Sequence, residues 1–180
     1  MVGYNFLQRA AVYAVTNAAI STLTSPNTPN LGDFSNEADG RLLNFKDTTA
    51  PRNVVYGKVR IGGLIAHAES TESDKFLHLI IVLASHEINA VSKVFFDGEE
   101  LTISTNTVTA PTRYNGKAKV YTHLGTDAQA ADANLVSESS SWTNAHKLSG
   151  IAYLYVRLEY DQDAFANGIP EITAEIEGKK

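Results

Sequence analysis

Apolar and polar residues alternate along much of the chain from residue 53 onwards, with the period of two that half-buried β-strands show. In one such run, Val55, Val59 and Ile61 alternate with polar neighbours. The segment 75–87 differs, because both of its alternating sets are apolar, which predicts a central strand covered on both faces. The strand segments expected from these patterns are 53–63, 64–70, 75–87, 88–96, 99–103, 116–125, 150–161 and 170–178.

Turns and edges follow from the same pattern. Asp97 and Gly98 stand between two apolar runs, and an Asp-Gly pair in that position is a strong signal for a β-hairpin. Segment 161–170, with Gly168 and Pro170, is expected to form a hairpin-like corner. The last strand should then turn Ile172, Ala174 and Ile176 inward and Glu171, Thr173, Glu175 and Glu177 outward, as a wet strand at a sheet edge would.

The N-terminal residues 5–23 have helical spacing. Leu7 and Val15 share one face, Leu23 widens it, and a following Ser-Pro pair ends the helix. Polar residues interrupt the segment too often for a membrane-spanning helix. It is expected to pack on a partner or on its own domain, to contact a membrane, or to be disordered. Any membrane contact of the chain is expected only through this helix.

A long connecting arm follows at 25–52, rich in Pro, Gly, Asn, Asp, Ser and Thr. Arms of this length are usually functional or ordered by a partner. Its spaced apolar anchors favour an arm that lies on a surface; they are Phe34, Leu42, Leu43 and Phe45. We therefore divide the chain into a helix and extended arm, residues 1–52, and a β-rich domain, residues 53–180. This second domain could continue in sequence beyond residue 180.

A second, shorter helix is expected inside the β-rich domain. Thr126 precedes Gln129 by three residues, which is the spacing of a capping box, and the Ala-rich run after it extends to about Leu135. The fold class predicted from these elements is α+β and β-rich. It combines an antiparallel or mixed sheet with an N-terminal helix, an extended arm and one short inserted helix.

Charge and cysteine content exclude several kinds of chemistry. The formal net charge is −5 at pH 7 and the pI is about 5.5, so the chain lacks the basic field that nucleic-acid binding requires. No nucleic-acid partner is expected. The chain has no cysteine, which excludes disulfides, thiolate metal sites and a cysteine nucleophile.

Neither a metal nor a cofactor site is expected. Asp161 and Asp163 resemble the start of a calcium loop, but Phe165 and Ala166 stand where such a loop needs an oxygen ligand and a glycine. A turn explains the two aspartates better. None of the five histidines has the spacing that places two imidazoles on one helix face for zinc.

Enzyme activity is not expected either, and no catalytic residue is assigned. Ser85, His86 and Glu87 are the residue types of a triad, but neighbours in a strand point to opposite faces. Two alternatives stay open: a tail-associated cell-wall hydrolase using His86 and Glu87, and a carbohydrate- or ligand-binding module. The binding module would use the aromatic residues Tyr114, Tyr121 and Trp142.

Four segments of the chain, taken together and in order, resemble a known family. They are "APRNVVYGKVRIGG", "DKFLHLIIVLASHEINAVSKVFFDGEEL", "VYTHLGTDAQAAD" and "HKLSGIAYLYVRLEYDQDAFANGIPEITAEIEGKK". The combination resembles a family of tail proteins of long-tailed phages that are related to the tail tip attachment protein of phage lambda. These proteins are also called host-specificity proteins, and they form the central tail hub, so the β-rich domain is expected to be a tail-hub domain. The resemblance covers about residues 50–180.

The resemblance implies a structural role in a siphophage-like tail tip, or baseplate hub. Family members are similar to the hub proteins of contractile tails and gene transfer agents. They form a homotrimer that closes the distal end of the tail tube and connects it to the central fibre for host attachment. The implied partners are further copies of the chain, neighbouring tail-tip and distal tail proteins, and the tape measure protein. The implied location is the virion tail tip, after assembly in the bacterial cytoplasm.

Family members usually run to many hundreds of residues, so the chain corresponds to the N-terminal hub region. It would be a fragment, a processed chain or a short split version, and receptor recognition by fibre modules does not carry over. The residues expected at assembly interfaces are Leu7, Val15, Leu23, Phe34, Phe45, Asp97 and Gly98.

Overall fold

A computed structural model of the chain describes Asn44 and residues 52–179. This part is β-rich, as predicted, and holds very little helix. Its strands are β1 (Lys58–Gly62), β2 (Leu64–Thr71), β3 (Phe76–Ala84), β4 (Ala90–Phe96), β5 (Glu99–Glu100), β6 (Thr102–Ser104), β7 (Thr107–Ala110), β8 (Ala118–His123), β9 (Ala152–Glu159) and β10 (Ile172–Glu177). Its helices are the 3-10 helix η2 (Thr112–Tyr114) and the α-helix α2 (Ala133–Glu138). The predicted N-terminal helix and nearly all of the arm lie outside the described residues.

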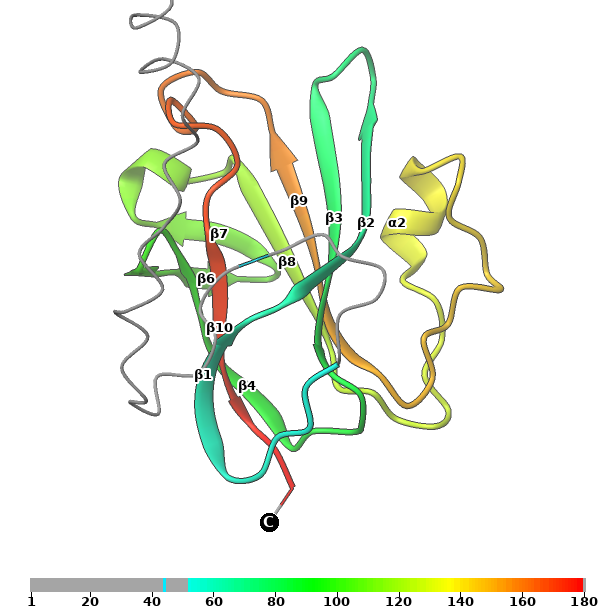
Figure 1. Cartoon of the computed structure of the whole chain (residues 1–180). Helices are drawn as coiled ribbons and strands as arrows, with labels where there is room; N and C mark the ends of the chain where they lie inside the picture. The colour runs from blue at the N-terminus through cyan, green and yellow to red at the C-terminus, as the bar shows by residue number, and fades with distance from the viewer. Residues whose placement is uncertain (1–43, 45–51, 180) are drawn as a thin grey trace, which may run out of the picture. The chain divides into compact units, whose positions relative to one another are not determined.

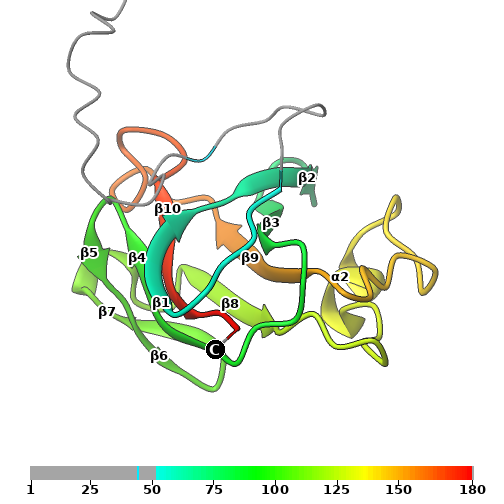
Figure 2. The same ribbon diagram turned by 60° about the horizontal axis from the view of Figure 1, so that its bottom comes forward.

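The strands form two antiparallel sheets (Figures 1 and 2). One has the order β1-β10-β4-β5, and the other has the order β2-β3-β9-β8-β7-β6. β1 continues into β2 after Gly63, and β5 continues into β6 after Leu101, so two bent strands pass from one sheet to the other. The sheets are therefore joined at both edges and enclose a shared interior.

The first of these corners depends on Gly63. A Cβ at this position would lie 2.7 Å from the carbonyl oxygen of Val82 and would also collide with the side chain of Ile81. Because Cβ atoms do not approach backbone this closely, only glycine lets the bent strand cross over β3 here. At the second corner, the N–H of Leu101 donates to the carbonyl oxygen of Val94 at 2.8 Å.

Apolar residues from the inner faces of both sheets form the main core. Phe96, Ala174 and Ile176 come from the four-stranded sheet, and they join Ile81, Leu154 and Val156 of the six-stranded sheet in one cluster. A second cluster covers the outer face of the six-stranded sheet: Ile80, Val82, Tyr153 and Tyr155 pack with Leu135 of α2 and with Trp142. β3 is therefore covered on both faces, as its pattern predicted, and Trp142 anchors its loop.

The hairpin at Asp97-Gly98 is confirmed. Both residues have positive φ, 48° and 82°, and Phe96 pairs with Glu99 across the turn. Two consecutive residues with positive φ are typical of the tight turn that suits the twist of an antiparallel pair.

The prediction for the last strand was wrong in two respects. β10 is not an edge strand, because it lies between β1 and β4. Thr173 does not face solvent but is buried, where its hydroxyl accepts a hydrogen bond from Arg60 Nε at 3.0 Å. The segment before it is not a hairpin either, since β9 and β10 belong to different sheets.

The predicted capping box was also wrong, although the short helix exists. The N-cap of α2 is Asp132, whose carboxylate accepts from the N–H groups of Asn134 and Leu135. The side chain of Gln129 instead accepts from the N–H of Gly125 at 2.8 Å and donates to the carbonyl oxygen of Leu148 at 2.8 Å. It holds two loops together before the helix begins.

Candidate functional site

Large apolar side chains that reach solvent are the first indication of an interaction surface. In the described ranges these are Val54, Tyr56, Tyr160 and Ile169, with exposed fractions of 60%, 72%, 71% and 58%. Tyr160 and Ile169 line the same pocket. This pairing of exposed apolar residues with a concave surface makes that end of the molecule the candidate assembly site.

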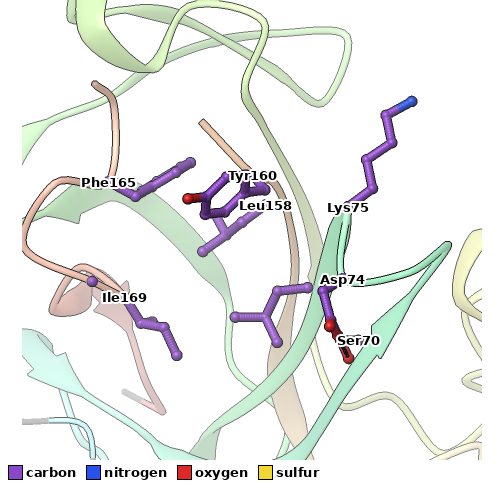
Figure 3. Close-up of a pocket in the computed structure, with 9 residues that line it drawn as sticks. Ser70, Asp74, Lys75, Leu158, Tyr160, Phe165 and Ile169 are labelled. Atoms are coloured by element: carbon purple, nitrogen blue, oxygen red, sulfur yellow. Dashed lines mark hydrogen bonds between the residues drawn. The ribbon is translucent and has the colours of Figure 1, made fainter. Parts of the chain in front are cut away.

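The pocket has a volume of about 270 Å³ and an apolar interior (Figure 3). The ends of β2 and β3, the end of β9 and segment 160–171 contribute its walls. Its lining consists of Ser70, Asp74, Lys75, Leu77, Leu158, Tyr160, Phe165, Gly168 and Ile169. Ligand pockets usually span roughly 300–1,000 Å³, so this one suits one or two side chains of a protein partner better than a cofactor.

One wall is the turn between β2 and β3, and local hydrogen bonds fix its shape. Glu72, Ser73 and Asp74 all have positive φ, and the Ser70 hydroxyl donates to the Asp74 carboxylate at 2.5 Å. The N–H of Tyr160 donates to the carbonyl oxygen of Lys75 at 2.7 Å, which ties this turn to the end of β9.

The opposite wall is segment 160–171, and Asp161 organises it. Its carboxylate accepts from the N–H groups of Asp163 and Ala164, and it pairs with Lys117 at 2.9 Å. The N–H of Ala164 and the Lys117 ammonium both hold the pKa of Asp161 below its usual value. The turn interpretation of these aspartates fits this geometry, and the side chain of Phe165 stacks on Tyr114 at 5.6 Å between ring centroids.

A second cavity, of about 300 Å³, adjoins the first through Ile169, which lines both. It lies between β2 and β3 on one side and the residues that lead into β10 on the other. Its lining consists of Asn44, Ile65, Leu79, Ile81, Ile169, Pro170, Glu171 and Ile172. We call the two adjoining cavities the hairpin groove, after the hairpin of β2 and β3 that forms one of its walls.

Asn44 bridges the two sides of this opening. Its Oδ1 accepts from the N–H of Ile172 at 2.5 Å, and its Nδ2 donates to the carbonyl oxygen of Gly63 at 3.3 Å. β1 pairs with β10 only as far as Gly62 opposite Thr173, so the side-chain amide acts where the backbone ladder stops. Sequence analysis missed this role, because one asparagine in a polar arm carries no distinguishing signal.

The sequence-predicted interface residues are not brought together within the described part. Leu7, Val15, Leu23, Phe34 and Phe45 lie outside the described residues. Asp97 and Gly98 are exposed, but the Asp97 carboxylate is engaged within the fold. It accepts from the N–H of Glu171 at 2.8 Å and from the Tyr114 hydroxyl at 3.0 Å. Their role at an interface stays a prediction.

The side chain of His86 is hydrogen-bonded to backbone groups. Its Nε2 accepts from the N–H of Val55 at 2.8 Å, so its Nδ1 carries the proton and donates to the carbonyl oxygen of Glu87 at 2.7 Å. Both ring nitrogens are thus occupied, and this arrangement gives no support to the hydrolase alternative. In the described ranges, no group of three or more His, Asp or Glu residues is placed to hold a metal ion.

The aromatic residues considered for carbohydrate binding do not form an exposed platform. Tyr114 and Trp142 are buried, with 1% and 7% of their surfaces exposed. Tyr121 stacks on Tyr155 at 5.2 Å with an interplanar angle of 13°. The rings are used for packing: Tyr114 lies in the core between the sheets, whereas Trp142 and Tyr121 pack on the outer face of the six-stranded sheet.

Two polar contacts near α2 were not foreseen. His123 Nε2 lies 2.8 Å from Asp132 Oδ2, and its ring stacks on Tyr153 at 4.3 Å. Burial raises the pKa of Asp132, but the hydrogen bonds from His123 and from the N–H of Leu135 outweigh it and lower the pKa overall. The pair fastens α2 to β8, and the Asp before an Ala-Asn-Leu run was the signal for its capping role.

The second contact is a carboxylate surrounded by serines. Glu69 of β2 accepts from the hydroxyls of Ser139, Ser140 and Ser141, and these bonds, led by Ser139, lower its pKa to about 2. The contact holds the loop after α2 against the sheet, which is a structural task.

No helix in the described ranges is both long enough and apolar enough to cross a membrane.

No family model matches the sequence, and no curated protein matches it. Among solved structures, the chain is similar to a chain of the virion of a native gene transfer agent particle. The two share 19% of residues at aligned positions, and the TM-score is 0.55 over 98% of this chain. The chain spans 39% of the length of that virion chain. The likeness shows that the two chains share a fold.

Proposed function

We propose that this protein is a structural component of a phage-like virion and acts in the central hub of the tail tip. In this role it closes the distal end of the tail tube and connects it to the host-recognition fibre. It works by assembly with copies of itself, as a homotrimer, and with neighbouring tail proteins, including the tape measure protein. Its work involves no catalysis.

The observation that carries the proposal is the shared fold with part of a gene transfer agent virion chain over 98% of this chain. Four sequence segments that together resemble phage tail hub proteins also support the proposal. The 39% share of the virion chain fits a hub region within a longer protein.

The chemistry of the described surface is consistent with assembly. The exposed apolar side chains of Tyr160 and Ile169 border a pocket that suits a partner's side chain. Asp161, a candidate for chemistry in the sequence, is instead engaged in a turn and an ion pair.

Light scattering over a dilution series tests the self-association step. The full chain is compared with a chain beginning at Ala50, which lacks the predicted helix and arm. A trimer that persists on dilution, and that weakens in the shorter chain, is the expected result. A monomer for both chains would assign trimer formation to other sequence and contradict the proposal that this region assembles the hub.

A further inference from the structure

The exposed large apolar side chains of the described ranges lie in two pairs. Tyr160 and Ile169 border the first cavity of the hairpin groove, whereas Val54 and Tyr56 belong to the segment that precedes β1. We call Val54 and Tyr56 the β1 patch. Large apolar side chains that gather at a surface mark interaction sites, so the domain has two such surfaces, one concave and one projecting.

Hydrogen bonds hold the β1 patch in a fixed conformation. The N–H of Val55 donates to His86 Nε2 at 2.8 Å, and the carbonyl oxygen of Val55 accepts from the N–H of Lys179 at 3.1 Å. Val55 itself is buried in the main core. Its neighbours on either side therefore point to solvent, as alternation along an extended segment requires. A surface that is already ordered loses little conformational entropy when a partner binds it.

The β1 patch and the groove lie at opposite ends of β3. Segment 53–55 is bonded to Ser85 and His86, just beyond the end of that strand, whereas Lys75, which lines the groove, immediately precedes its start. The nine residues of β3 span roughly 30 Å. In Figure 1, the segment before β1 lies near the C-terminus at the bottom, and segment 160–171 lies at the top. The two surfaces of one chain therefore cannot meet each other.

The two surfaces carry opposite charge. Segments 52–58 and 178–179, which hold the β1 patch, contain three basic residues and no acidic one: Arg52, Lys58 and Lys179. Segments 70–77 and 160–172, which border the groove, contain five acidic residues and one basic residue: Glu72, Asp74, Asp161, Asp163 and Glu171 against Lys75. Glu175 pairs with Lys58 and Lys117 pairs with Asp161, but both surfaces keep their sign. Complementary charge favours an encounter and fixes its orientation.

We propose that the β1 patch of one copy docks into the hairpin groove of the next copy. Val54 and Tyr56 cover the apolar cavity beside Tyr160 and Ile169, and the basic residues around the patch face the acidic border of the groove. Because the contact joins two different surfaces, it is head-to-tail, and contacts of this kind close into a ring when the rotation from copy to copy allows it. A ring of three copies rests on the proposed homotrimer of the tail hub, whereas the contact between two copies can be tested alone.

Disulfide trapping between two differently substituted full-length chains tests the contact, and the chain suits it because it has no cysteine of its own. Chains with Val54→Cys or Tyr56→Cys are mixed with chains that carry Ile169→Cys or Asn167→Cys, which keeps one apolar residue of the β1 patch in every mixture. A disulfide forms only when the two Cα atoms lie about 4.4–6.8 Å apart. In the matched control, the same β1-patch chains are mixed with Ala145→Cys, an exposed position in the loop after α2. Circular dichroism verifies that each variant is folded.

After oxidation, non-reducing electrophoresis and mass spectrometry distinguish mixed disulfides from those between identical chains. At least one groove mixture should give the mixed disulfide at a yield about tenfold above its control, and adding Asp163→Lys to the groove chain should reduce that yield severalfold. Equal yields for groove and control mixtures would overturn the proposal. Disulfides mainly between two β1-patch chains would also overturn it, because they would indicate a symmetric contact.

Light scattering of the unsubstituted chain over a dilution series separates this contact from the proposed function. A trimer whose variants give no mixed disulfide above the control would overturn the contact and leave the homotrimer standing. A monomer whose variants still give the mixed disulfide would support the contact and contradict a stable homotrimer of this region. A monomer without the disulfide would overturn both.

Discussion

Replacing Asn44 by alanine tests whether the arm is clamped to the domain. The substitution removes the acceptor for the N–H of Ile172 and the donor to the carbonyl oxygen of Gly63. Ile172 is only 1% exposed, so its N–H would be left without a partner where water has little access.

A buried donor left unpaired costs about 1–3 kcal/mol. The bond to Gly63 is longer, at 3.3 Å, and adds little. We therefore expect Asn44→Ala to lower the free energy of unfolding by about 2 kcal/mol. For a chain of this size that corresponds to a fall in Tm of roughly 4–8 °C.

Urea denaturation and thermal unfolding of the full chain measure the effect. Asn167→Ala is the matched control, because it removes an exposed asparagine from segment 160–171 and should change stability by less than about 0.5 kcal/mol. An Asn44→Ala protein as stable as the control would refute the clamp.

Three further predictions address the corner, the core and the serine-bound carboxylate. Gly63→Ala should destabilise the domain by about 1–3 kcal/mol in urea denaturation, because its Cβ would strike Val82 and Ile81; an unchanged midpoint would contradict the tight corner. Leu154→Ala, at a fully buried site between the sheets, should cost about 2–5 kcal/mol in the same assay, whereas an effect below 1 kcal/mol would place Leu154 outside the core. The lowered pKa of Glu69 gives stability that is present above about pH 4.5 and is lost as the pH falls towards about 2. Thermal unfolding of Glu69→Gln should accordingly show a smaller fall in Tm than wild type across that pH range, and parallel curves would disprove the assigned contact.

The sequence predicted the strands well because a period of two is a local property. The run at 75–87, apolar on both sets, could only be satisfied by a strand with cover on two faces, and β3 has that cover. Asp97-Gly98 likewise specified its hairpin through backbone preferences of those two residues.

The errors arose where the outcome depended on distant partners. Thr173 alternates with apolar residues and so was assigned to solvent, but Arg60 of the neighbouring strand supplies a hydrogen bond that allows burial. β10 was assigned to an edge because its acidic residues suggested one, yet Lys58 pairs with Glu175 at 2.7 Å across the β1–β10 contact.

The candidate site could not be predicted from the sequence for the same reason. The hairpin groove is formed by segments about ninety positions apart, near residues 70–77 and 160–172, and nothing in either segment alone signals a pocket. The contact of Asn44 with Ile172 spans 128 positions. Side-chain hydrogen bonds of this range follow from the completed fold.

Immunogold electron microscopy of phage-like particles, with an antibody raised against residues 52–179, tests the central claim most directly. Particles would be taken from the bacterium that encodes the chain, and detergent-opened tails would serve as well as intact ones if neighbours cover the domain. The account predicts gold particles confined to the distal end of the tail. Label on heads or along the tube, or none on opened tails that contain the protein by mass spectrometry, would contradict a tail-tip hub.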